Sequence, residues 1–119
     1  MRKILIVEDN ALNRDLLTQL LEDDYRLIQA TNGPEGIRLA VEQIPDLILM
    51  DMGLPGMDGW EATRAVKAEA ACRHIPVVAV TAHARQEDHE RALRAGCDGV
   101  ITKPIDEERL FECLHGLLE

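Results

Sequence analysis

The segment Asp46-Leu47-Ile48-Leu49-Met50-Asp51 places four consecutive large apolar side chains between two aspartates. A strand with one solvated face alternates apolar and polar residues, whereas a strand of a parallel sheet is covered on both faces and is apolar throughout. The segment therefore predicts a buried parallel strand, Leu47–Met50, that is followed at once by the acidic residue Asp51.

Short apolar runs of the same kind occur on both sides of this segment, and helical-period stretches separate them. The other predicted strands are Ile4–Val7, Leu27–Ala30, Val77–Val80 and Val100–Thr102. Five strands that alternate with helices predict an α/β fold, a doubly wound parallel sheet with right-handed crossovers and helices on both faces. The length of 119 residues is that of one domain, so we expect residues 1–119 to form a single unit.

Two of the predicted helices carry contrasting patterns. The first has a leucine stripe at i, i+4 and i+8, made of Leu12, Leu16 and Leu20 and flanked by Leu17 and Leu21. The fourth, at about 85–95, has Leu93 as its only sizeable apolar side chain. Two ion pairs could support it, Glu87 with Arg91 and Glu90 with Arg94, at a few tenths of a kcal/mol each. We therefore expect the fourth helix to be weakly anchored and able to move.

Composition excludes several classes of function. The net charge is -9 and only three residues are aromatic, whereas nucleic-acid binders cluster cations and stacking rings. The N-terminal apolar run stops at Glu8, too short for a secretory signal, and no stretch reaches membrane-spanning length, so we expect a cytoplasmic protein that binds neither membrane nor nucleic acid. Three cysteines without metal-type spacing are best explained as small buried hydrophobic residues.

Polar residues follow four of the predicted strands. Glu8-Asp9, Asp51, Thr81 and Lys103 stand directly after the first, third, fourth and fifth strands. Sites in open α/β sheets form beyond the carboxyl ends of the strands, so these residues should converge in one pocket. Each alone could be a solvated strand end, a loop acid or a surface charge, but coincidence explains four such positions poorly.

Each residue type in this pocket has a chemical role. Three carboxylates that repel one another favour a hard cation with oxygen ligands, and Mg²⁺ suits one or two carboxylates plus waters. Asp51 could then attack phosphorus as a nucleophile and form an aspartyl phosphate. Positive charge from Lys103, and a hydrogen bond from Thr81, would stabilise the phosphoryl oxygens.

The sequence resembles the response regulator receiver domain over essentially its whole length. The matching segments, in the order and spacing of that family, are Ile4-Leu5-Ile6-Val7-Glu8-Asp9-Asn10, Asp46-Leu47-Ile48-Leu49-Met50-Asp51, Leu54-Pro55-Gly56-Met57-Asp58-Gly59, Val80-Thr81-Ala82 and Thr102-Lys103-Pro104. The resemblance implies a flavodoxin-like sheet with the strand order 2-1-3-4-5.

The same resemblance implies a mechanism. A histidine kinase or histidine phosphotransfer protein would phosphorylate Asp51, and Mg²⁺ would bind Glu8, Asp9, Asp51 and the backbone carbonyl of Gly53. Lys103 would contact the phosphoryl group, Thr81 would swing toward it, and the Lys103–Pro104 bond would be cis. The chain would pass its signal to a downstream protein and, since it would turn over no external metabolite, would not be an enzyme.

One position departs from the family and several others vary. Three residues before the lysine the family usually carries Tyr or Phe, whereas this chain has Val100, so we expect signalling through Thr81 and the fourth helix. Gly53 offers no side chain that could shield the site, and His83 either reaches the site or faces solvent. Asn10 and Asn13 resemble residues of phosphorelay receivers whose first helix faces the histidine donor, although Asn10 could simply cap that helix.

Two rival functions belong to other classes. A flavin or nucleotide carrier on the same fold would need a Ser/Thr/Gly-rich loop after the first strand, where Glu8-Asp9-Asn10 would instead repel phosphate. A phosphorylation-independent pseudo-receiver would serve as a scaffold. Such proteins usually lose the acids or the lysine, and this chain retains them.

Overall fold

Strands and helices alternate strictly along the chain, as the apolar runs predict. The computed structural model describes residues 1–82 and 85–118. The strands are β1 (Lys3–Val7), β2 (Arg26–Ala30), β3 (Leu47–Asp51), β4 (Val77–Thr81) and β5 (Gly99–Thr102). The helices are α1 (Ala11–Leu21), α2 (Gly33–Gln43), α3 (Gly59–Ala68), α4 (Gln86–Ala95) and α5 (Glu107–Leu118). Each predicted strand exists and is one residue longer than predicted, so that Asp51 and Thr81 are the last residues of their strands.

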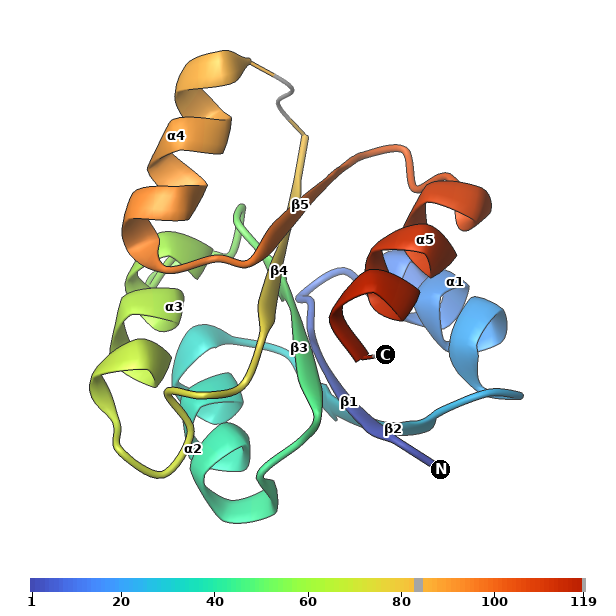
Figure 1. The fold of residues 1–119 in the computed structure, drawn as a ribbon, viewed down its shortest axis with the longest axis horizontal. Helices are drawn as coiled ribbons and strands as arrows, with labels where there is room; N and C mark the ends of the chain where they lie inside the picture. The colour runs from blue at the N-terminus through green and yellow to red at the C-terminus, as the bar shows by residue number, and fades with distance from the viewer. Residues whose placement is uncertain (83–84, 119) are drawn as a thin grey trace.

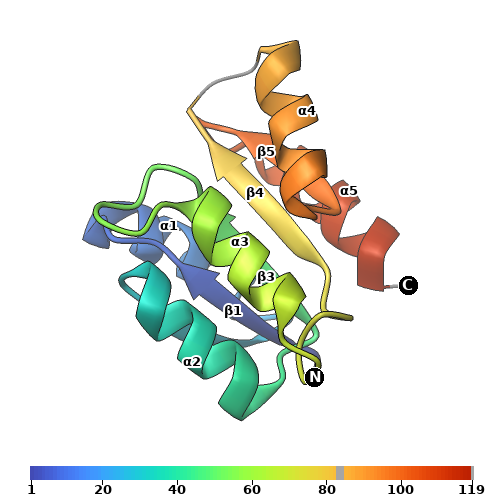
Figure 2. The ribbon, with the colours of Figure 1, turned by 90° about the vertical axis from the view of Figure 1, so that its left-hand side faces the viewer.

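The sheet is parallel and has the order β2-β1-β3-β4-β5, which confirms the α/β class and the strand order. Helices α1 and α5 cover one face, and α2, α3 and α4 cover the other (Figure 1). The turned view separates the same three layers (Figure 2). Because both faces are covered, β3 and β4 are buried along their whole length.

Successive strand residues feed two separate cores, one on each face of the sheet. Leu5, Ile48 and Met50 belong to the core beneath α2, α3 and α4. Their sequence neighbours Ile4 and Leu49 belong to the core beneath α1 and α5. This alternation is the pleat of a strand whose two sides are both covered, and it explains why the runs are apolar throughout.

The leucine stripe predicted for the first helix is only partly correct. Leu17 and Leu21 are buried and Leu20 packs against the same core, but Leu12 is 79% exposed and Leu16 is 41% exposed. Positions four apart drift by about 40° per step around a helix, because one turn takes 3.6 residues, so Leu12 and Leu16 leave the buried arc. An apolar strip on α1 therefore faces outward.

Side chains at the helix ends set where several helices begin. Asn10, Asn32 and Asp58 each accept a backbone hydrogen bond from the residue three positions later, and thereby cap α1, α2 and α3. Asp106 accepts backbone hydrogen bonds from Glu108 and Arg109 at the start of α5. No helix in the described part of the chain is long and apolar enough to cross a membrane.

Helix α4 differs from the others, as the sequence indicates. Its buried residues are Ala92 and Ala95, and the larger Leu93 is 64% exposed. Neither of the two ion pairs suggested for this helix forms among the described residues. The helix is therefore held to α3 and β5 by small side chains and by one contact of Arg91, described below.

Candidate functional site

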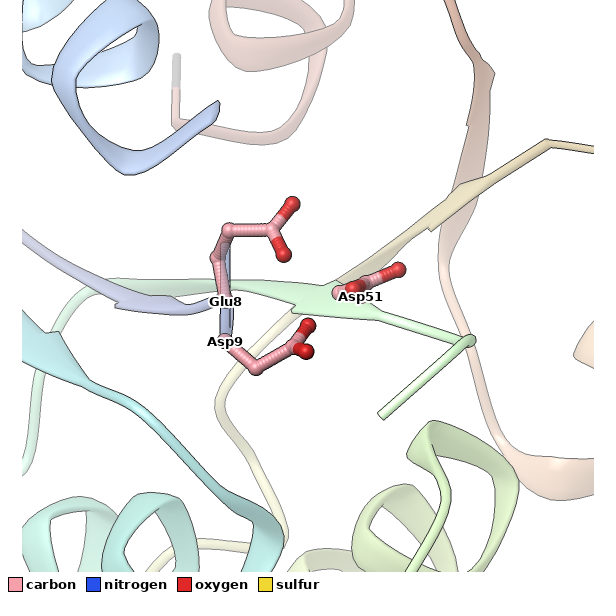
Figure 3. Close-up of side chains that lie close together, drawn as sticks. All are labelled: Glu8, Asp9 and Asp51. Carbon is pink, nitrogen blue, oxygen red and sulfur yellow. The ribbon is translucent and has the colours of Figure 1, made fainter. Parts of the chain in front are cut away.

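Three carboxylates meet at the carboxyl ends of β1 and β3. Glu8 is 2% exposed and Asp51 is 5% exposed, whereas Asp9 faces solvent. One oxygen atom from each can be chosen so that all three lie within 4.8 Å of one another. The carboxylates of Glu8 and Asp9 extend from the end of β1 toward Asp51 (Figure 3). This spacing suits three ligands of one small cation.

The backbone of the acidic pair is fixed from two sides. The amide of Glu8 donates to the carbonyl of Ala30 in β2, at 3.0 Å. One guanidinium nitrogen of Arg14 donates to the carbonyl oxygens of Glu8 and Asp9, at 2.9 and 3.0 Å. The side chain of Asn10 caps α1, and its backbone N–H donates a hydrogen bond to Oε2 of Glu8, at 3.2 Å. Helix α1 therefore starts directly after the acidic pair.

Asp51 accepts two hydrogen bonds on the same oxygen. The amide of Gly53 donates to Oδ1 at 3.0 Å, and the ammonium of Lys103 donates to it at 3.2 Å. Gly53 is exposed and lines the cavity described below, which fits the open access expected of a residue without a side chain. The role of its carbonyl as a metal ligand stays a prediction.

Lys103 joins two of the acids. Its ammonium lies 3.3 Å from Oε1 of Glu8 as well as 3.2 Å from Oδ1 of Asp51, and its side chain is 25% exposed. Burial works to lower the pKa of Lys103, but the carboxylates of Asp51 and Glu8 outweigh it and raise that pKa. The Lys103–Pro104 bond is cis, as the sequence resemblance implies.

Among the described residues, Glu8 is the carboxylic acid whose pKa the protein environment shifts most. Burial, and then the neighbouring Asp51 carboxyl group, raise the pKa of Glu8 to about 7. The backbone amide of Asn10, and then the ammonium of Lys103, lower this pKa and offset the rise only in part. Glu8 and Asp51 are both buried, and they share the single ammonium of Lys103. One positive charge therefore serves two carboxyl groups, and the site can accept a further cation. A divalent cation is the group that the donor set lacks, and the residues present fit Mg²⁺.

Thr81 completes the set of predicted residues. It ends β4, is 4% exposed, and its carbonyl accepts the amide of Lys103 at 2.7 Å. Thr81, Lys103 and the acids line one open cavity of about 460 Å³. The structure therefore brings together all six residues chosen from the sequence. His83 lies outside the described residues.

Five residues of the cavity wall were not predicted from the sequence as functional: Met52, Trp60, Ala82, Asp88 and Arg91. The carbon atom of the Arg91 guanidinium lies 4.6 Å from the centroid of the Trp60 ring. Trp60 is the single tryptophan of the chain and follows the capped start of α3, a position that could have drawn attention to it. No sequence signal pairs it with Arg91, because the contact depends on how α3 and α4 pack.

Comparison with known proteins identifies the family. A family model described as the response regulator receiver domain matches residues 4–115. The chain belongs to this family. The receiver domain is 45% identical over 118 residues to the polar-differentiation response regulator DivK of Brucella anthropi, a match that covers 98% of this chain and 96% of the relative.

Solved structures of similar receiver domains agree with the fold. The receiver domain of the sensor histidine kinase PA1611 from Pseudomonas aeruginosa is 36% identical with a TM-score of 0.91, covering 98% of this chain and 97% of that one. That structure is described as holding a magnesium ion in its active-site cleft. The chemotaxis protein CheY4 of Vibrio cholerae is 28% identical with a TM-score of 0.93, and 99% of each chain is covered.

Membership of the family establishes the general function. The protein is a receiver domain of the two-component type and resembles DivK, and a phosphorylation switch is general to the family. Receiver domains are signalling modules and not classical enzymes, and magnesium in the active-site cleft is typical of them. The acidic cluster needed for such a site, Glu8, Asp9 and Asp51, is present here.

Proposed function

We propose that Asp51 is the phosphoacceptor of this receiver domain. A carboxylate oxygen of Asp51 attacks the phosphorus of a phosphohistidine donor, the P–N bond breaks, and an acyl phosphate forms on the aspartate. The observation that carries the proposal is the position of Lys103, whose ammonium lies 3.2 Å from Asp51 and can stabilise phosphoryl oxygens. Thr81, buried in the same cavity wall, would donate a hydrogen bond to one of them.

The proposal assigns Mg²⁺ to Glu8, Asp9, Asp51 and the backbone carbonyl of Gly53. When bound, the metal supplies positive charge that offsets the phosphoryl oxygens. The chain's own residues do the rest: Asn10 and Arg14 hold the acidic pair in place, and the amide of Gly53 orients Asp51. The raised pKa of Glu8 supports a cation site, because a bound cation would stabilise the ionised form of this buried carboxyl group.

The donor, we propose, is a histidine kinase or a histidine phosphotransfer protein that contacts α1. Leu12 and Leu16 expose an apolar strip on this helix, and Asn13 lies in the cavity wall beside the acids. A partner seated on the strip would therefore stand next to Asp51. Oδ1 of Asn10 already accepts the capping hydrogen bond, so Asn13 is the asparagine whose side chain we assign to such a contact.

Output would pass through Thr81 and α4 to a downstream protein. Val100, at the position where the family usually has an aromatic ring, is half-buried against the core beneath α2, α3 and α4. A small β-branched side chain held there cannot expose or hide a ring. Displacement of α4, which two alanines anchor, is the remaining route.

The test is phosphorylation with acetyl phosphate and Mg²⁺, read by intact mass. We expect one added phosphoryl group on the wild type, none on Asp51→Asn, and none when EDTA replaces Mg²⁺. Asp15→Asn, an exposed acid on α1 outside the cavity wall, is the matched control and should behave as the wild type. A wild type that stays unmodified would instead favour the phosphorylation-independent pseudo-receiver.

A further inference from the structure

Arg91 holds an unusual position beside the candidate site. Its guanidinium lies over the ring of Trp60, which is 7% exposed, and Arg91 itself is exposed. The sequence suggests Glu87 as its partner, but no carboxylate of the described residues lies within ion-pair distance of Arg91. An aromatic face attracts a cation without neutralising it, so Arg91 keeps its full charge.

Arg91 and Trp60 both line the cavity that contains Asp51. Among the described residues of this wall, the cations are Lys103 and Arg91. Lys103 is already shared between Glu8 and Asp51. Of the two cations that line the described cavity wall, Arg91 is therefore the one that forms no ion pair with a carboxylate.

Phosphorylation changes the charge at the centre of this cavity. A phosphoryl group carries about −1.5 to −2 charges and three strong acceptor oxygens at neutral pH. Arg binds such oxygens through paired, charge-assisted hydrogen bonds. Such paired bonds are stronger than the contact between a cation and the face of an aromatic ring. The exchange of one contact for the other is therefore favourable.

We propose that Arg91 is a second phosphoryl-binding residue, which leaves the face of Trp60 to bind the phosphoryl group on Asp51 and draws α4 toward the site. The inference rests on the proposed function of Asp51. It gives α4 a direct sensor of phosphorylation in a chain that has Val100 in place of the usual aromatic residue. The small anchors Ala92 and Ala95 leave α4 able to follow Arg91.

The test compares Arg91→Gln with Arg94→Gln, an exposed arginine of the same helix that is absent from the cavity wall. Beryllofluoride with saturating Mg²⁺ is the phosphoryl mimic, and calorimetry measures its affinity. We expect Arg91→Gln to weaken beryllofluoride binding about tenfold, the low end for a lost charged hydrogen bond. Arg94→Gln should match the wild type. The affinity for Mg²⁺ measured without beryllofluoride should be unchanged in both variants, because Arg91 is not among the proposed metal ligands.

A second measurement uses the NMR signal of the Trp60 ring, which Arg91 is proposed to leave. The indole N–H signal of Trp60 should shift when beryllofluoride binds the wild type, and Arg91→Gln should lose most of that shift. Arg91→Lys, which keeps the charge but not the planar fork, should fall between the two. Equal beryllofluoride affinities for Arg91→Gln and Arg94→Gln would overturn the inference and leave phosphorylation of Asp51 standing. Failure of the wild type to bind the mimic or to accept phosphate would instead remove the proposed function.

Discussion

The ammonium of Lys103 lies 3.2 Å from Oδ1 of Asp51, although 52 positions separate the two residues in the sequence. The same ammonium lies 3.3 Å from Glu8, so one cation serves two buried carboxylates. In the metal-free protein, the ion pairs of Lys103 with Glu8 and Asp51 therefore contribute to the stability of the fold.

Replacement of Lys103 by Met should destabilise the metal-free protein. The change leaves Glu8 and Asp51 buried without a cation, and we expect a loss of about 2 kcal/mol at pH 8, below the usual cost of a broken buried pair because Lys103 is partly exposed. Urea unfolding in EDTA measures it. Arg38→Met, which removes an exposed pair with Glu42, should change stability by less than about 0.5 kcal/mol. Equal effects of the two variants would contradict the argument.

The pKa of Glu8 predicts how the stability of the metal-free protein depends on pH. Because the fold raises this pKa from 4.5 to about 7, the folded state binds more protons than the unfolded state between these values. Stability from Glu8 is thus fully present below about pH 4.5 and is lost as pH rises through about 7. The loss amounts to roughly 3 kcal/mol at most.

Glu8→Gln isolates this contribution. Glutamine does not titrate, so the stability of the variant relative to the wild type should rise with pH and level off above about pH 8. Chemical unfolding in EDTA at a series of pH values gives the difference, in which the titration of groups that lie away from Glu8, Asp51 and Lys103 cancels. A difference that stays constant with pH would rule out the raised pKa of Glu8.

Asp9 should matter for metal binding and little for the fold. It is exposed, so Asp9→Asn should leave the urea midpoint in EDTA close to that of the wild type. Loss of one of three carboxylates should weaken Mg²⁺ binding at least about tenfold, since even residues behind the ligands have effects of that size. Calorimetric titration with Mg²⁺ measures this, with Asp15→Asn as the control. Unchanged affinity in Asp9→Asn would exclude Asp9 as a ligand.

Gly59 permits the close approach of α3 to the site. A Cβ atom there would overlap the carbonyl oxygen of Asp51 and come within 2.7 Å of the Cα of Met52. Backbone atoms cannot move aside as a flexible side chain can, so we expect Gly59→Ala to cost about 3 kcal/mol. Gly116→Ala, which meets nothing within 4 Å inside α5, should instead stabilise by about 0.5–1 kcal/mol. Urea unfolding compares the two.

Much of this molecule can be predicted from local pattern. Continuous apolar runs indicate strands covered on both faces, and the polar residue that follows each run locates the site at the carboxyl edge of the sheet. Asp51 and Lys103 could therefore be placed in one site from the sequence. The order of the strands came from the family resemblance, since periodicity alone does not fix it.

Other features depend on tertiary packing and escaped prediction. The outward direction of Leu12 and Leu16 follows from which arc of α1 meets the sheet, and five leucines in one helix leave several arcs possible. Arg91 has carboxylates four and three residues before it, yet it stacks on Trp60 of another helix. Local charge pairing is worth only about 0.2–0.5 kcal/mol, so a tertiary contact readily replaces it.

The position of β1 between β2 and β3 has a consequence for synthesis of the chain. β2 pairs with one edge of β1, and β3 then finds the other edge still open. β4 and β5 each add to the edge left by the strand made before them. No strand has to be inserted between two others that are already joined. The sheet can therefore grow on the ribosome in the order of translation.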